Sequence, residues 1–200
     1  MKNKFLIAAL AAASISIVAC NNGGKSNSGN LKDTTGSTTH ASISDTATKT
    51  AVNAKTTASV KVLINDYLQL KNALAKDNSN DAAAAGKSMS ADFGKFDQGV
   101  LTADQKKSYT DIADDAKENA EHIGKSGGNI AHQREHFDIL SKDMYDLVKL
   151  FGAGQPLYVD HCPMYNNKKG AIWLSETAAI KNPYLGLGMP TCGTIKEQLK

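Results

Sequence analysis

Apolar residues recur every three to four positions between residues 57 and 151, which is the spacing of one buried face on an α-helix. Four such segments follow one another with short connections, so the pattern predicts a mainly α fold built as an antiparallel four-helix bundle. The expected core positions are Val60, Leu63, Ile64, Tyr67, Lys71 and Leu74; Ala82, Ala85, Met89, Phe93 and Phe96; Tyr109, Ile112, Ala116, Ala120 and Ile123; and Phe137, Leu140, Met144, Leu147, Val148 and Phe151.

Local signals mark the ends of the third and fourth helices. Thr102 and Gln105 have the spacing of a capping box, in which each side chain satisfies a free backbone N–H at the helix start. The glycine-rich stretch 124–128 ends this helix, and Asn129 is positioned to cap the next one.

The last fifty residues have a different pattern. Gly152, Gly154 and Pro156 stop the helices, and Leu157 to Cys162 predict one short strand. Further prolines and glycines interrupt the rest, so residues 152–198 are expected to form an irregular tail that carries the metal ligands or a disulfide. This tail should pack on the bundle (57–151), which makes residues 57–198 one domain.

The N-terminus predicts an exported lipoprotein. Lys2 and Lys4 precede an apolar run from Phe5 to Val18 that is too short to span a bilayer, which is typical of a signal peptide. Ile17-Val18-Ala19-Cys20 then supplies the branched, small and thiol residues of a lipid-attachment site. Cleavage would remove residues 1–19 and leave Cys20 acylated, so that lipid holds the chain to a membrane of the cell envelope.

Residues 20–56 predict a flexible tether between the lipid and the domain. This segment consists almost entirely of Asn, Gly, Ser, Thr, Ala and Lys, and the first aromatic residue after it is Tyr67. Loss of Lys2 and Lys4 lowers the count of basic residues from 23 to 21, against 20 acidic ones. A nearly neutral chain without a basic cluster argues against binding to nucleic acid.

Two short motifs in the tail carry the candidate chemistry. His161-Cys162-Pro163-Met164 and Met189-Pro190-Thr191-Cys192-Gly193 place an imidazole, two thiols and two thioethers close together in sequence. Thiolate, thioether and imidazole are the ligands that favour Cu(I) and, less specifically, Zn(II). Cys162, Met164, Met189, Cys192 and His161 are therefore candidate ligands for copper or another soft metal ion.

Histidines on the predicted helices extend this ligand set. His132 and His136 are four residues apart and lie on one helical face. His122, near the end of the preceding helix, would approach them if the two helices pack as an antiparallel hairpin. His122, His132 and His136 are therefore candidate nitrogen ligands.

The same cysteines have a second interpretation. Outside the cytoplasm an even pair of cysteines favours a disulfide, and Cys162–Cys192 would close a loop of about 30 residues. Disulfide, metal ligands and free thiols remain open alternatives. A Cys–His hydrolase is disfavoured, because neighbouring residues on a strand point to opposite faces and His161 cannot then serve Cys162 as base. We therefore expect no enzyme.

Several motifs together resemble an uncharacterised bacterial domain family. They are Glu121-His122-Ile123, Gln133-Arg134-Glu135-His136-Phe137, Leu140-Ser141, His161-Cys162-Pro163-Met164, Lys169-Gly170-Ala171, Trp173-Leu174-Ser175, Asn182-Pro183-Tyr184 with Gly186, and Met189 with Cys192-Gly193. The resemblance covers residues 57–198. Family members occur in Bacteroidota as lipoproteins or fused to periplasmic adaptor subunits of heavy-metal efflux pumps.

The resemblance implies a connection with metals, through a heavy-metal efflux adaptor or pump as partner. The expected function is that of an envelope lipoprotein that binds copper, as Cu(I), or a similar soft ion for buffering or delivery to efflux. The alternative is a disulfide-stapled helical interaction module without a metal. Asn21 follows Cys20 in place of an aspartate that would retain the protein at the inner membrane, so we expect the outer membrane, facing the periplasm. Trp173 and Asn182-Pro183-Tyr184 are expected to serve folding, and Arg134 to pair with a carboxylate or with carbonyls of the tail.

Overall fold

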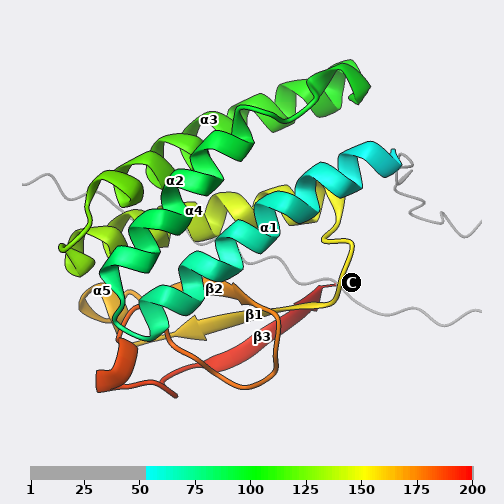
Figure 1. Cartoon of the computed structure of the whole chain (residues 1–200). Coiled ribbons are helices and arrows are strands. Elements are labelled where there is room, and N and C mark those ends of the chain that lie inside the picture. The colour runs from blue at the N-terminus through cyan, green and yellow to red at the C-terminus, as the bar shows by residue number, and fades with distance from the viewer. Residues whose placement is uncertain (1–52, 200) are drawn as a thin grey trace, which may run out of the picture. The chain divides into compact units, whose positions relative to one another are not determined.

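The computed structural model describes residues 53–199. The leader 1–19, Cys20 and the tether as far as residue 52 lie outside the described residues, and the expected lipidation site lies there with them. Four long helices, α1 (Ala54–Ala75), α2 (Ser79–Phe93), α3 (Ala103–Lys125) and α4 (Ile130–Phe151), are followed by a small sheet and the one-turn helix α5 (Tyr165–Lys168). The mainly helical fold class is confirmed (Figure 1).

The helices begin where local chemistry satisfies their free N–H groups. The Asn53 side chain caps α1, which starts three residues before the predicted domain boundary. Thr102 accepts a hydrogen bond from the Gln105 N–H at 3.3 Å, while the Gln105 side chain accepts one from the Thr102 N–H at 3.1 Å, so the predicted capping box is confirmed. Asn129 caps α4 as expected.

The helices bury the predicted faces. Of the expected core positions only Ile112 is half-buried, and all the others are buried. Consecutive long helices pack along each other, and α4 also contacts α1. Among residues 53–199, no helix combines the length and hydrophobicity needed to cross a membrane.

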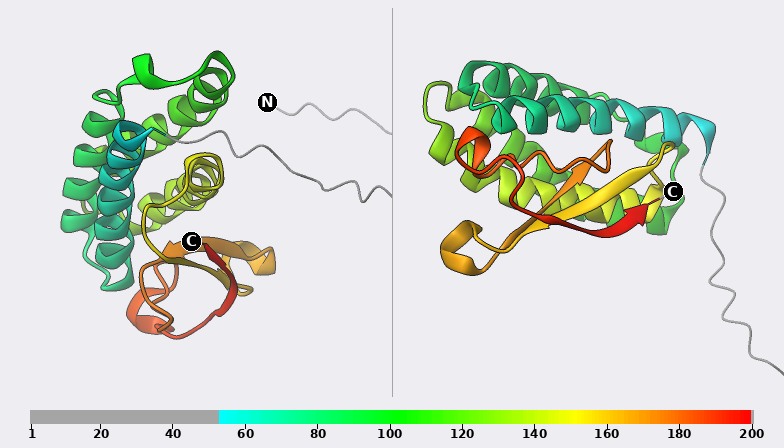
Figure 2. Two further views of the ribbon diagram at one scale, coloured as in Figure 1. Left: turned by 90° about the vertical axis from the view of Figure 1, so that its right-hand side faces the viewer. Right: turned by 90° about the horizontal axis from the view of Figure 1, so that it is seen from below.

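The expectation of an irregular tail was wrong in one respect, because three segments of the tail pair into a sheet. Strands β1 (Leu157–Cys162), β2 (Ala171–Ser175) and β3 (Thr194–Leu199) form an antiparallel sheet in the order β2-β1-β3. The predicted strand 157–162 is confirmed as the central strand. The sheet lies on the side of α1 and α4, away from α2 and α3, with β2 packed against α4 (Figures 1 and 2).

The segment between β2 and β3 contains the 3₁₀ turn η2 (Gly186–Gly188). Buried Asn182 fixes this segment, because its side-chain oxygen accepts hydrogen bonds from the N–H groups of Tyr184 and Leu185 at 2.8 and 2.9 Å. Trp173 is fully buried. Trp173 is thus a buried ring and Asn182-Pro183-Tyr184 a fixed turn, as their expected folding roles require.

Candidate metal centre

The two cysteines of the tail lie in contact. Cys162 is the last residue of β1 and is fully buried, whereas Cys192 is half-buried in the turn before β3. Their Sγ atoms are 3.1 Å apart and both thiols are free. This separation is longer than a disulfide bond of about 2.05 Å, so both sulfurs keep their lone pairs available.

Strand pairing and one asparagine hold the pair together. Antiparallel pairing of β1 and β3 sets Thr194 opposite His161 and so brings the preceding turn beside the end of β1. The Asn182 side chain donates to the Cys192 carbonyl at 2.6 Å, and its main-chain N–H donates to the Pro190 carbonyl at 2.9 Å. The cysteine pair is therefore preorganised by the backbone.

The two thiols differ in acidity. Burial alone would raise the pKa of Cys162, but hydrogen bonds from Cys192, from the N–H groups of Met164 and Tyr165 and from Asn182 lower it below its ordinary value. The pKa of Cys192 is raised, chiefly by its hydrogen bond with Cys162 and then by burial. Cys162 is therefore the sulfur that ionises first, and the thiolate is the form that binds metals or attacks disulfides.

Both candidate thioethers lie close to the thiols in the chain, Met164 just after the end of β1 and Met189 in the turn that carries Cys192. The side chains of Met164 and Met189 are about half exposed, at 48% and 47%. The Met164 N–H bonds both sulfurs, and the Met189 carbonyl accepts a hydrogen bond from the Cys192 N–H at 3.2 Å. Half-exposed methionines contribute little to a core, so these two are not simply core filler.

His161 does not join the cysteines. Its half-buried imidazole packs against Gly170, where an added Cβ would clash with the ring. Within the described chain, the one group of three or more His, Cys, Asp or Glu ligand atoms lying within 4.8 Å of one another consists of His122, His132 and His136. The sulfur and imidazole ligands, expected from the sequence as one set, are thus separated into two groups.

The three helical histidines meet across α3 and α4. His122 comes from the last turns of α3, and His132 and His136 from successive turns of α4, as the helical spacing predicted. Burial, followed by the neighbouring His122 and His132, lowers the pKa of His136. His132, which shares a helical face with His136 as expected, belongs to this group.

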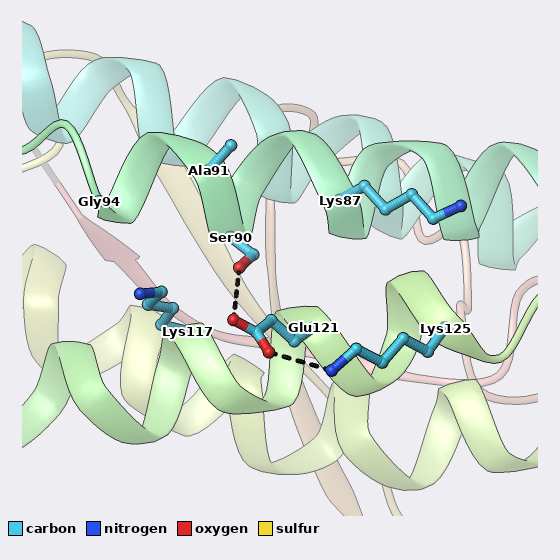
Figure 3. Close-up of a pocket in the computed structure, with 7 residues that line it drawn as sticks. All are labelled: Lys87, Ser90, Ala91, Gly94, Lys117, Glu121 and Lys125. Atoms are coloured by element: carbon cyan, nitrogen blue, oxygen red, sulfur yellow. Dashed lines mark hydrogen bonds and ion pairs between the residues drawn. The ribbon is translucent and has the colours of Figure 1, made fainter.

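A groove between α2 and α3 has a different chemistry (Figure 3). Its volume is about 430 Å³, and Lys87, Lys117 and Lys125 line it. Glu121 accepts hydrogen bonds there from Ser90 at 3.4 Å and from Lys125 at 3.2 Å. Three ammonium groups around one engaged carboxylate repel cations, so this groove does not suit a metal ion.

Asp160 was not singled out from the sequence. It is fully buried on β1 opposite Trp173, and neither carboxylate oxygen has a hydrogen-bond partner among the described residues. Burial raises its pKa to about 6, and Lys71 partly offsets the shift. The sequence signal was a single acid within an otherwise apolar strand, next to the ligand motif.

Part of the chain is similar to a known protein family. Residues 63–156 match a family model described as Protein of unknown function (DUF3347). The matched residues include His122, His132 and His136, whereas Cys162 and Cys192 lie beyond them. No curated protein and no solved structure matches the chain.

Proposed function

We propose that this chain is an envelope lipoprotein that binds a soft metal ion, copper or a similar one, and buffers it or delivers it to heavy-metal efflux machinery. The observation that carries the proposal is the contact of two free thiols, Cys162 and Cys192, at 3.1 Å. Thiolates are the protein ligands that soft ions prefer.

The pair needs only a small movement to hold an ion. Metal–sulfur bonds of about 2.3 Å in tetrahedral geometry place two sulfurs about 3.8 Å apart. Cys192 is half-buried, so a shift of about 0.7 Å from the observed contact requires no rearrangement of β1. Cys162, with its lowered pKa, would bind first, and Cys192 would release its proton as the ion enters.

The exposed methionines support transfer of the ion. Met164 and Met189 expose about half of their side chains and lie close to the cysteines in the chain. Thioethers are weak, neutral ligands that suit Cu(I) and can be replaced one at a time by ligands of an acceptor protein. The proposed mechanism is therefore ligand exchange without covalent catalysis.

The scaffold and the anchor belong to the same proposal. The packing of consecutive helices with short connections supports an antiparallel four-helix bundle as the support of the site. The motif ending in Cys20 supports acylation and attachment to the outer membrane facing the periplasm, and the resemblance to efflux-adaptor fusions supports an efflux adaptor or pump as partner.

The sulfur contact also favours a second candidate function. Oxidation of both thiols by a two-electron acceptor of the cell envelope, with release of two protons, would close the 3.1 Å gap by about 1 Å and form a Cys162–Cys192 disulfide. The chain would then be a stapled interaction module without a metal. The two candidates differ in whether the thiols remain free in the purified protein.

An anaerobic titration separates them. The full chain in detergent is purified without reductant, its free thiols are counted, and after reduction it competes with a chromogenic chelator for Cu(I). The proposal expects tight binding of one Cu(I) that is lost in Cys162→Ser, Cys192→Ser and weakened in Met164→Leu, Met189→Leu. His161→Asn serves as a control that retains binding. Equal affinity in the serine variant and the unaltered chain would reject the proposal.

A further inference from the structure

The rings of His122, His132 and His136 form a compact cluster at the solvent-facing end of the α3–α4 hairpin. His122 stacks on His136 with ring centroids 4.4 Å apart and an angle of 9°, while His132 meets His136 edge-on at 4.5 Å and 88°. The His122 and His132 side chains are 48% and 41% exposed, so a hydrated ion can reach them.

Hydrogen bonds fix which nitrogen of His136 is free. Its Nδ1 lies 2.9 Å from the side-chain oxygen of buried Asn119. The Asn119 amide nitrogen donates to the Asp115 carbonyl at 2.8 Å, which sets the orientation of the amide and leaves its oxygen facing the ring. An amide oxygen only accepts, so Nδ1 carries the proton and Nε2 of the neutral ring presents a lone pair.

His132 is oriented in the same way. Its Nδ1 lies 3.2 Å from the Glu135 carboxylate, which also only accepts, so Nδ1 donates there and Nε2 is the nitrogen that faces the cluster. These two Nε2 atoms face each other at 3.2 Å. A shared proton or a bound metal ion accounts for such a contact, and a histidine whose other nitrogen donates to a carboxylate or an amide oxygen has the usual arrangement of a metal ligand.

The spacing also fits a metal ion. Metal–nitrogen bonds of about 2.0–2.1 Å at a tetrahedral angle place two ligand nitrogens about 3.3 Å apart, close to the observed 3.2 Å. The His122 ligand atom lies within 4.8 Å of the others. Since its ring is half exposed, a small rotation completes a three-histidine site and leaves a fourth position open to water.

The surroundings define the class of ion. Glu118 lies 3.7 Å from His122, and Glu135 binds His132, so two carboxylates favour a divalent cation nearby. Imidazole without thiolate suits Zn(II), Cu(II) and Ni(II) rather than Cu(I). We infer that His122, His132 and His136 form a second metal site, independent of the cysteines, that binds a borderline divalent ion such as Zn(II).

Cobalt(II) is the probe that tests this site, because its visible spectrum reports both geometry and sulfur ligation. In the full chain carrying Cys162→Ser and Cys192→Ser, we expect one Co(II) per chain with the absorption of a tetrahedral site and no sulfur charge-transfer band. Zn(II) should displace it. His122→Asn and His132→Asn, both at exposed positions that need not disturb folding, should each abolish stoichiometric binding, and the matched variant His161→Asn should keep it.

Asn119→Ala tests whether Asn119 orients His136. Loss of the hydrogen bond from His136 Nδ1 to Asn119 should weaken Co(II) binding about 10–100-fold without changing the ligand set.

The inference is overturned if Co(II) does not bind, if the histidine variants bind as well as the parent chain, or if binding disappears with the cysteines. The last result would still leave the thiol site of the proposed function in place. Loss of Cu(I) binding in the serine variant with Co(II) binding retained would establish two separate sites.

Discussion

The hydroxyl of Tyr67 on α1 lies 2.8 Å from the hydroxyl of Ser141 on α4, in the buried layer between the helices and the sheet. The same Tyr67 oxygen accepts a hydrogen bond from the main-chain N–H of Leu174 on β2 at 3.1 Å. One phenol therefore joins two helices to the sheet that carries the cysteines.

Replacement Tyr67→Phe should destabilise the fold by about 1–3 kcal/mol, because it leaves the buried Leu174 N–H without its acceptor. Urea unfolding followed by circular dichroism measures the loss. Tyr158→Phe, at a half-buried position on β1, is the matched control and should cost less. Equal effects of the two substitutions would contradict the role assigned to the Tyr67 hydroxyl.

Arg134 on α4 connects the end of α1 to the segment before β3. Its guanidinium donates to the Pro183 carbonyl at 2.7 Å, to the Leu74 carbonyl at 3.0 Å and to the Asp77 carboxylate, whose pKa it lowers. Arg134→Lys keeps the charge, but its single nitrogen cannot replace both Nε and Nη2, which bind acceptors in different directions, and the change should cost about 1.5–3 kcal/mol in free energy of unfolding. Lys107→Ala, which removes an exposed ion pair, should cost under about 1 kcal/mol. An Arg134→Lys variant as stable as the parent would rule out this anchoring role.

Asp66 should make stability depend on pH. Burial and neighbouring Asp92 raise its pKa from 3.8 to about 6. A carboxyl group with a raised folded-state pKa contributes stability below pH 3.8 that is lost as the pH rises through about 6. Asp66→Asn should therefore raise the free energy of unfolding at pH 7, on the order of 2 kcal/mol. It should also make the free energy of unfolding less dependent on pH between about pH 4 and 6. Thermal melts at several pH values test this, with exposed Asp111→Asn as control; an unchanged pH profile in Asp66→Asn would refute it.

Gly86 allows α2 and α3 to approach closely. An added Cβ would lie 2.8 Å from the Ala120 carbonyl oxygen and 2.9 Å from the Gly124 nitrogen, both main-chain atoms that cannot move alone. Gly86→Ala should destabilise the protein by about 1–3 kcal/mol despite the better helix propensity of alanine. Gly188→Ala has open space around it and should be nearly neutral. Stabilisation by Gly86→Ala would show that the helices do not pack as described.

The sequence predicted the parts of the fold that depend on neighbours along the chain. The helical faces, the capping box of Thr102 and Gln105, and the meeting of His122 with His136 all follow from helical periodicity and short turns. Strand β3 was missed because Lys196, Glu197 and Gln198 favour helices, and only pairing with distant β1 makes them extended.

The division of the ligands into two sites could not be predicted for the same reason. Whether Cys162 lies near the helical histidines depends on how the sheet packs on α4, which no local pattern records. Asn119, the hydrogen-bonding partner of His136, was not predicted either, because asparagine is common in turns and caps and carries no signal of a buried contact.

X-ray absorption at the copper edge of the reduced, Cu(I)-loaded full chain tests the central claim most directly. If Cys162 and Cys192 hold the ion, the first shell contains sulfur, which disappears in the Cys162→Ser, Cys192→Ser variant and persists in His122→Asn. A first shell of only nitrogen or oxygen atoms, unchanged when both cysteines are replaced, would contradict a soft-metal site at the cysteine pair.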